Sequence, residues 1–256
     1  MTRRATTVRR RVRYELMILT VLLVFVVLVF LLRDRPGSTE TVEATPFVVT
    51  PEPAPTPIPD NYLEYTEGKW VEVEYGTGNS NTIDDSGFTT PDKKTNEDLV
   101  QFAIQAWENR WGYVLGTFGD VMTEEMLQFK LEQYPEEIEE YEDFIRENWI
   151  GRRTVDCMGL IKGYGWYDPN SGAILYNTGA TIDTGTEYMF QLATVKGPIE
   201  TMPETPGLIV YAEGHVGVYI GDGMVIESIC TEGGVVKTKL ADRHFTHWME
   251  CPFIEY

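Results

Sequence analysis

The chain has 256 residues, of which 43% are hydrophobic and 24% charged, and a formal net charge of −19 at pH 7. This length allows one large domain or two small ones, and the composition is typical of a globular protein. An acidic chain is not expected to bind nucleic acid, whose phosphates repel it. The three cysteines are too few for a disulfide scaffold, and Cys and His show no metal-ligand spacing, so we expect no zinc site. The thiol chemistry inferred below needs neither a metal nor an organic cofactor, and we expect none.

The start of the chain predicts a membrane anchor over residues 14–33. Its core, Leu16 to Leu32, has seventeen residues, no charge and Thr20 as the single polar side chain. Such a run spans most of a hydrocarbon core about 30 Å thick. A cleaved signal peptide is the alternative, but its apolar region is usually about 7–15 residues long and ends at a small-residue cleavage site. The sequence that follows, RDRPGS, has no such site.

Charge predicts the orientation of this anchor. Six arginines lie in the tail of residues 1–13, whereas only Arg33 and Arg35 closely follow the apolar run. By the positive-inside rule the tail is cytoplasmic and everything after Arg35 is extracytoplasmic. Eight of the 21 basic and two of the 40 acidic residues precede Pro36, so the outer part carries 13 basic and 38 acidic side chains, a formal charge of −25. We therefore expect a single-pass membrane protein with an acidic outer part.

Two segments separate the anchor from the main domain. Residues 34–60 contain seven prolines among Thr, Glu and Val, a composition that favours an extended linker and cannot bury a core. Residues 61–94 contain a strand-like run, Lys69 to Tyr75, followed by a stretch rich in Gly, Asn, Ser and Asp. We interpret residues 61–94 as an N-terminal arm of the main domain.

The remaining sequence, residues 95–256, predicts helices followed by strands. Thr95 and Asp98 resemble a capping box, and apolar residues then recur at helical spacing. A second helical tract, Thr123 to Trp149, is interrupted at Pro135. Three later segments, GLIVYAEG, HVGVYIGDGMVIESI and GVVKTKL, read as strands, with a turn at Gly221–Gly223. This order predicts an α+β domain with N-terminal helices packed on an antiparallel sheet.

Cys157 is the candidate nucleophile. It follows a polar, Gly-flanked lead-in and precedes apolar residues, which indicates a loop running into a short helix. A helix N-terminus stabilises a thiolate through its unpaired N–H groups and its dipole. A buried structural cysteine is the alternative. A bridge between Cys230 and Cys251 is possible, and the odd count leaves at least one thiol free.

His215 and Glu227 are the candidate base and its orienting acid. His215 opens a strand that ends in the turn, and a three-residue loop over Gly221–Gly223 would set Ile220 opposite Met224 and Gly217 opposite Glu227. His215 and Glu227 would then share a face as diagonal neighbours. This is the logic of a nucleophile triad. His244 and His247 lack such a partner pattern, and we expect them to be structural.

These segments resemble the NlpC-type papain-like cell-wall cysteine peptidases. DCMGLI at Cys157 is similar to the family's Asp-Cys-Ser-Gly-Leu-Val signature, and GHVGVYIGDGMVIE is similar to its His-Val-Gly-Ile-Tyr-Ile-Gly hairpin. WGYVLGTFG looks like a degenerate form of the upstream aromatic-glycine motif, so that Tyr113 matches its tyrosine. The resemblance covers about residues 100–256. Met158 and Glu227 depart from the usual Ser and the usual His, Asn or Gln, and an insertion of some thirty residues separates Gly119 from Cys157.

The resemblance implies an endopeptidase that cleaves the γ-D-glutamyl–diamino acid bond of peptidoglycan stem peptides. It assigns Cys157 as nucleophile, His215 as base and Glu227 as the orienting residue, and it implies that Asp156 and Tyr113 contact the substrate. Two alternatives remain: a non-catalytic wall-binding or scaffold module of the same fold, and a thiol amidase or acyltransferase acting on another amide or ester. An intact Cys–His–Glu set favours catalysis.

Overall fold

The computed structural model describes residues 61–65, 69–89 and 93–256, which belong to one compact unit, Thr56–Tyr256. The predicted tail 1–13, anchor 14–33 and linker 34–60 lie outside the described residues. Within the described ranges, every helix is too short or too polar to cross a bilayer.

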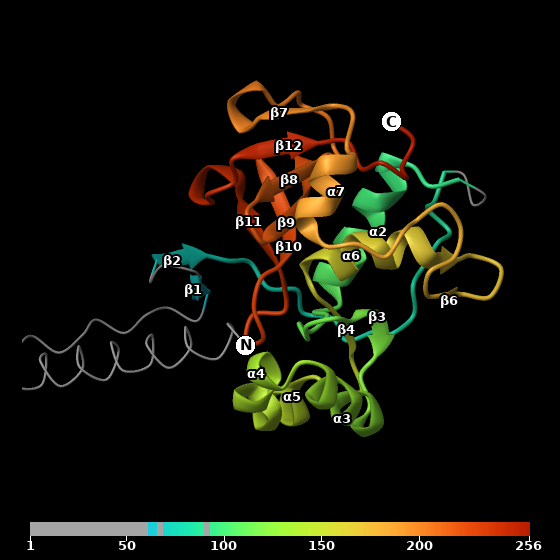
Figure 1. The fold of residues 1–256 in the computed structure, drawn as a ribbon, viewed down its shortest axis with the longest axis vertical. Helices are drawn as coiled ribbons and strands as arrows, with labels where there is room; N and C mark the ends of the chain where they lie inside the picture. The colour runs from blue at the N-terminus through green and yellow to red at the C-terminus, as the bar shows by residue number, and fades with distance from the viewer. Residues whose placement is uncertain (1–60, 66–68, 90–92) are drawn as a thin grey trace, which may run out of the picture. The chain divides into compact units, whose positions relative to one another are not determined.

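A six-stranded antiparallel sheet forms the centre of the domain (Figure 1). In spatial order its strands are β11 (Val235–Lys239), β10 (Met224–Ser228), β9 (His215–Gly221), β8 (Ile209–Ala212), β12 (His247–Met249) and β7 (Lys196–Pro198). Short 3-10 turns follow β7 and β11, at Ile199–Thr201 and Leu240–Asp242. The sheet has a hydrophobic cluster on each face, because alternate residues of β8, β9 and β10 are apolar and buried.

Two helices cover one face of the sheet, α2 (Asn96–Glu108) and α6 (Cys157–Trp166) (Figure 1). Thr95 caps α2 by accepting a hydrogen bond from the N–H of Asp98, as the sequence predicts. Leu99 and Phe102 of α2 join Leu160 of α6 in the main core. The predicted α+β class, with N-terminal helices packed on an antiparallel sheet, is confirmed.

Residues between α2 and α6 form a small helical unit with its own core. It contains α3 (Glu124–Gln133), α4 (Pro135–Ile138), a 3-10 turn (Glu139–Tyr141) and α5 (Glu142–Asn148), flanked by the paired strands β3 (Phe118–Val121) and β4 (Arg153–Val155). Pro135 begins α4, which confirms the interruption expected there. Buried Leu127, Ile138 and Trp149 pack together in this unit, and the Trp149 indole donates to the carbonyl of Thr231 near the sheet. We call Glu124–Asn148 the helical insertion.

Smaller elements complete the domain. They are β1 (Tyr62–Tyr65) and β2 (Lys69–Glu72) in the N-terminal arm, the pair β5 (Tyr167–Asp168) and β6 (Ala173–Ile174) after α6, and α7 (Thr186–Leu192) before the sheet. The arm touches the sheet edge, because Glu74 and Lys237 exchange backbone hydrogen bonds.

The hairpin between β9 and β10 corrects one detail of the sequence prediction. Met224 pairs with Gly221 instead of Ile220, and a β-bulge then shifts the register so that Val225 faces Tyr219 and Ile226 faces Val218. The loop is thus a two-residue turn at Asp222–Gly223, with the extra residue absorbed by the bulge. The shorter loop and the bulge shift the strand pairing by one residue in opposite directions. His215 and Glu227 therefore still lie on the same face of the hairpin.

Candidate active site

Cys157 is the first residue of α6, as the loop-to-helix pattern predicts. Asp156 caps the helix by accepting a hydrogen bond from the N–H of Gly159. Gly159 lets the helix start close to β3, because a Cβ at that position would lie 1.9 Å from the carbonyl oxygen of Thr117. The local sequence therefore fixes both the start of the helix and the place of the thiol.

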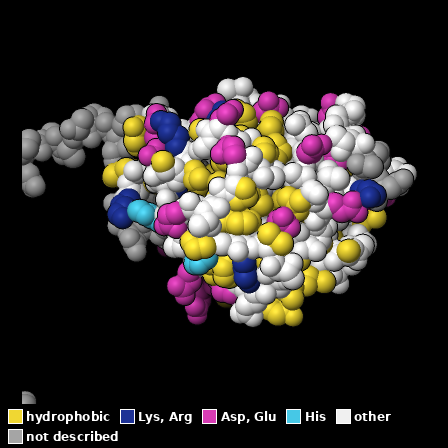
Figure 2. Space-filling view, turned by 90° about the horizontal axis from the view of Figure 1, so that it is seen from above, with side chains coloured by type: hydrophobic (Ala, Val, Ile, Leu, Met, Phe, Trp, Pro, Cys, Tyr) yellow, Lys and Arg dark blue, Asp and Glu magenta, His cyan; other side chains and the backbone are white. Residues whose placement is uncertain are grey.

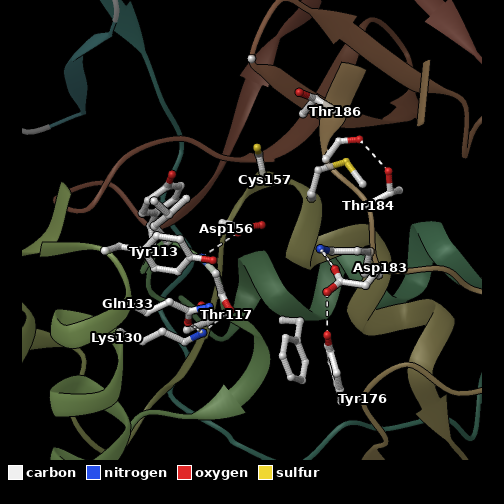
Figure 3. A pocket seen from close by; sticks show the side chains of 18 of the residues that line it. Tyr113, Thr117, Lys130, Gln133, Asp156, Cys157, Tyr176, Asp183, Thr184 and Thr186 are labelled. Atoms are coloured by element: carbon white, nitrogen blue, oxygen red, sulfur yellow. Dashed lines mark hydrogen bonds and ion pairs between the residues drawn. The ribbon is translucent and has the colours of Figure 1, made fainter. Parts of the chain in front are cut away.

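The half-buried Cys157 side chain projects into a cleft of about 890 Å³ (Figure 3). On one side the cleft is bounded by Tyr113 and the helical insertion, and on the other by Tyr176, Asp183 and the start of α7. The backbone N–H of Val216 lies near the sulfur and lowers the pKa of the thiol. Because Val216 follows His215 in β9, this contact sets the thiol beside the strand that carries the candidate base.

The surroundings of Cys157 favour its neutral thiol over the thiolate. Burial, followed by the nearby charge of Asp156, raises its pKa to about 12, and the hydrogen bonds from the backbone N–H groups of Val216 and Met158 offset this only in part. Burial thus opposes the thiolate that a helix N-terminus would favour, and the thiolate expected from the sequence stays a prediction. Desolvation of the charged form outweighs the helix dipole here.

The raised pKa predicts that Cys157 has no thiolate absorbance at neutral pH. The measurement is the ultraviolet difference spectrum between the wild-type protein and Cys157→Ala as a function of pH, which removes the contribution of the other two thiols. The difference should grow only in strongly alkaline solution. A thiolate band at pH 7 would instead show a preformed thiolate–imidazolium pair.

His215 and Glu227 are paired, as the sequence predicts. Nε2 of His215 lies 2.6 Å from Oε2 of Glu227, and both side chains are buried. Gly217 makes room for this contact, because a Cβ there would lie 2.5 Å from Cγ1 of Val225 and 3.3 Å from Cβ of Glu227. Phe245 stacks on the imidazole with ring centroids 5.9 Å apart. The ring of His215 is therefore held in one orientation.

Arg243 and Thr238 complete the surroundings of Glu227, and sequence reasoning missed both. Nε and Nη2 of Arg243 donate to the two carboxylate oxygens at 2.8 and 2.7 Å, and the hydroxyl of Thr238 donates to Oε1. Burial alone would raise the pKa of Glu227, but the hydrogen bond and charge of His215, with those of Arg243, lower it to about 2. Glu227 is thus a carboxylate at any ordinary pH.

The residues expected to contact substrate line the same cleft as Cys157. Tyr113 is half-buried in its wall, and Asp156 is almost fully buried beside the thiol. The two carboxylate oxygens of Asp156 accept the N–H groups of Gly159 and Gly116, and burial raises its pKa. Asp156 therefore has a structural function whether or not it also binds substrate, and contact with substrate stays a prediction for both residues.

The other two histidines and the other two cysteines are not part of the Cys157, His215 and Glu227 set. Nδ1 of His247 shares a hydrogen bond of 2.9 Å with the hydroxyl of Thr246. Nε2 of His244 lies 3.1 Å from Nζ of Lys69 at the surface. Cys230 and Cys251 are both free thiols, so the possible bridge between them is not formed. Over the described ranges, no three His, Cys, Asp or Glu side chains gather closely enough to hold a metal ion.

Comparisons with known proteins give two similar solved structures. No family model matches the sequence, and no curated protein does. The P60 domain of antigen MAP1204 from M. avium subspecies paratuberculosis is 17% identical, with a TM-score of 0.35, over 63% of this chain and 98% of that one. The peptidoglycan hydrolase RipB from Mycobacterium tuberculosis is 16% identical, with a TM-score of 0.33, over 63% of this chain and 67% of that one. The chain is thus similar to both of these proteins. The identities and TM-scores are too low to show which family the chain belongs to.

Proposed function

We propose that the protein is a cysteine endopeptidase that hydrolyses peptidoglycan stem peptides. The observation that carries this proposal is the placement of Cys157 at the N-terminus of α6, inside the cleft and against β9, the strand whose first residue, His215, is oriented by a buried carboxylate. A thiol, an imidazole and an orienting carboxylate in this order are the parts of a nucleophile triad.

The first half of the reaction forms a thioester. Because Nε2 of His215 is engaged by Glu227, Nδ1 is the nitrogen that accepts the thiol proton as the sulfur attacks the scissile carbonyl carbon. General-base removal of this proton suits a thiol whose pKa is raised by burial. The N–H groups at the start of α6, that of Cys157 included, stabilise the oxyanion. The imidazolium then protonates the leaving amine as the C–N bond breaks.

The second half of the reaction releases the acid. His215 takes a proton from water, the resulting hydroxide equivalent attacks the thioester carbonyl, and the proton returns to the sulfur as the C–S bond breaks. Glu227 remains ionised throughout and favours the imidazolium that forms in each half. The chemistry requires only groups that belong to the chain and water.

The substrate class follows from the resemblance of the Cys157 and His215 segments to NlpC-type peptidases. We assign the bond between γ-D-glutamyl and the diamino acid, with Asp156 and Tyr113 on the wall where the substrate would lie. Purified wall fragments incubated with the full-length protein should yield peptides that end in glutamate, and mass analysis identifies the new ends. Products cut at another amide or ester would favour the amidase or acyltransferase alternative, and intact fragments would favour a binding module.

We further propose that the cleft faces the outside of the cell, on a chain anchored through residues 14–33. The arginine-rich tail, the uncharged apolar run and the proline-rich linker support this orientation. Protease added to intact protoplasts should remove the C-terminal domain while leaving a cytosolic marker protein untouched. Protection of the domain in cells whose marker is also protected would contradict the orientation.

A further inference from the structure

The helical insertion forms one wall of the cleft that contains Cys157. Four residues of α3 and its end line this wall: Phe129, Lys130, Gln133 and Tyr134. Lys162, Tyr176 and Asp183 lie across the cleft, and Figure 3 shows Lys130 with Gln133 on one side and Asp183 with Tyr176 on the other. The insertion is outside the segments that resemble the peptidase motifs, so any contact that it makes with substrate would be an added source of specificity.

Lys130 has an unusual environment for a cation in this wall. The residue is 7% exposed, and its ammonium donates to the carbonyl of Gly116 at 2.7 Å and to the amide oxygen of Gln133 at 3.0 Å. Both oxygens are uncharged, and an ammonium has a third N–H to donate. Lys162 differs, because it is paired with the carboxylate of Asp183 at 2.6 Å. Lys130 is thus the cleft lysine without a directly bonded carboxylate, although the charges of Asp156, Asp120 and Asp183 act on it from farther away.

The charge of the rest of the molecule indicates what kind of ligand Lys130 would attract. The part of the chain after Arg35 has a formal charge of −25, and Figure 2 shows acidic side chains spread over one face of the domain. Such a surface repels a carboxylate-bearing ligand unless a local cation compensates. Burial lowers the pKa of Lys130, which reflects the cost of holding the ammonium away from water. The nearby carboxylates of Asp156, Asp120 and Asp183 offset only part of that cost, because the pKa is still lowered, and a directly bonded carboxylate from a ligand would offset more of it.

We propose that Lys130 binds a free carboxylate of the substrate and so selects γ-glutamyl peptides with an ionised α-carboxyl group over their carboxamide forms. This inference rests on the proposed function. In a γ-glutamyl linkage the α-carboxylate stays free and lies only a few bonds from the scissile carbonyl, so it enters the cleft together with that carbonyl. A charge-assisted hydrogen bond to an ammonium is stronger than the neutral bond that a carboxamide can offer.

A purely structural function for Lys130 would give a different result. Lys130 supports the carbonyl of Gly116, the N–H of Gly116 donates to Asp156, and Asp156 caps the helix of Cys157. If Lys130 acted only through these contacts, its loss would slow the cleavage of every substrate by the same factor. A change that depends on the substrate's carboxylate therefore separates direct recognition from positioning.

The test compares two synthetic L-alanyl-γ-D-glutamyl-diamino acid peptides that differ only at the glutamyl α-position, carboxylate or carboxamide. With the full-length protein in detergent, we expect kcat/KM to favour the carboxylate by about ten- to a hundred-fold. Lys130→Met should remove most of this preference, mainly by raising KM for the carboxylate peptide, and Lys130→Arg should keep much of it. Lys239→Met, which removes a lysine that does not line the cleft, is the matched control and should leave the preference unchanged.

Binding measurements keep this test separate from the proposed reaction. Calorimetry with Cys157→Ala, which cannot turn over the peptides, should give a lower Kd for the carboxylate form, and the additional change Lys130→Met should abolish the difference. Cleavage of neither peptide by the wild type would count against the proposed function, while calorimetry would still decide on Lys130. Equal Kd values, the absence of binding, or an equal loss of kcat/KM on both peptides in Lys130→Met would overturn the inference.

Discussion

Cys157→Ala is expected to lower kcat by about 10⁴-fold or more on peptidoglycan fragments, because loss of the nucleophile of a triad removes nearly all of its catalysis. The change deletes one sulfur from a half-buried position, so folding should be kept. The measurement is the initial rate of peptide release, with circular dichroism to verify the fold.

Cys230→Ala is the matched control for this experiment. Cys230 is also a half-buried free thiol, but it follows β10 and does not line the cleft that contains Cys157. We expect near wild-type rates for it. A folded Cys157→Ala protein that retained activity would exclude thiol catalysis. Wild-type protein that bound wall fragments without cleaving them would favour the non-catalytic module.

Glu227→Ala is expected to reduce kcat by about ten- to a thousand-fold, because His215 loses the group that holds its ring and stabilises its charged form. It should also lower the free energy of unfolding by about 3–5 kcal/mol, because Arg243 is left as a buried charge without its counter-ion. The side chains of Glu227 and Arg243 are 0% and 2% exposed. The measurements are steady-state kinetics and denaturant unfolding on the same samples.

Glu227→Gln separates the charge of this residue from its shape. The amide oxygen can still accept a hydrogen bond from His215, so we expect a smaller loss of kcat than in Glu227→Ala. The pKa of Glu227 is lowered from 4.5 to about 2, so its carboxylate contributes stability that is complete above pH 4.5 and is lost as the pH falls towards 2. The wild-type unfolding free energy should therefore fall more steeply over this window than that of Glu227→Gln.

Arg243→Met completes a double-mutant cycle with Glu227→Gln. Each single change leaves one buried partner uncompensated, whereas the double variant leaves none, so the double variant should be more stable than the sum of the two losses predicts. Additive losses would show that the carboxylate and the guanidinium do not interact.

The role of Glu227 in catalysis has its own contradicting outcome. Near wild-type kcat in a folded Glu227→Ala protein would remove Glu227 from the mechanism.

The local parts of the site could be predicted from the sequence because each depends on short-range rules. The start of α6 at Cys157 follows from a polar, Gly-flanked lead-in before an apolar run, and the pairing of His215 with Glu227 follows from the alternation of side chains along a hairpin. The exact register could not be predicted, since a β-bulge near Ile220 leaves no clear signal in the residues around the turn.

The long-range parts could not be predicted in the same way. Arg243 is sixteen residues from Glu227 in an irregular segment after Lys239, where no periodicity indicates which way a side chain points. A signal did exist, because a glutamate among the apolar residues of a central strand needs a cation, and Arg243 is an arginine close beyond the next strand. The pKa of Cys157 depends on burial by distant segments, which no motif encodes.

The helical insertion shows a third limit of the sequence. Its helices and the break at Pro135 could be predicted from periodicity and composition, but its place in the molecule could not. Only the folded chain brings Lys130 to the carbonyl of Gly116, fourteen residues earlier, and so into the wall of the cleft. A hydrophilic insertion in the sequence is thus a contributor to the candidate site.

The four hydrogen bonds that converge on Glu227 also constrain how this site can evolve. If the glutamate is replaced by a neutral residue while Arg243 is still present, the free energy of unfolding falls by about 3–5 kcal/mol. This is a large part of the 5–15 kcal/mol that keeps most domains folded. Replacement of Arg243 alone lowers the free energy of unfolding in the same way, because it leaves the carboxylate of Glu227 buried without its counter-ion. The two positions should therefore be inherited as a pair, so that descendants of this protein either keep both or replace both through a rare stabilised intermediate.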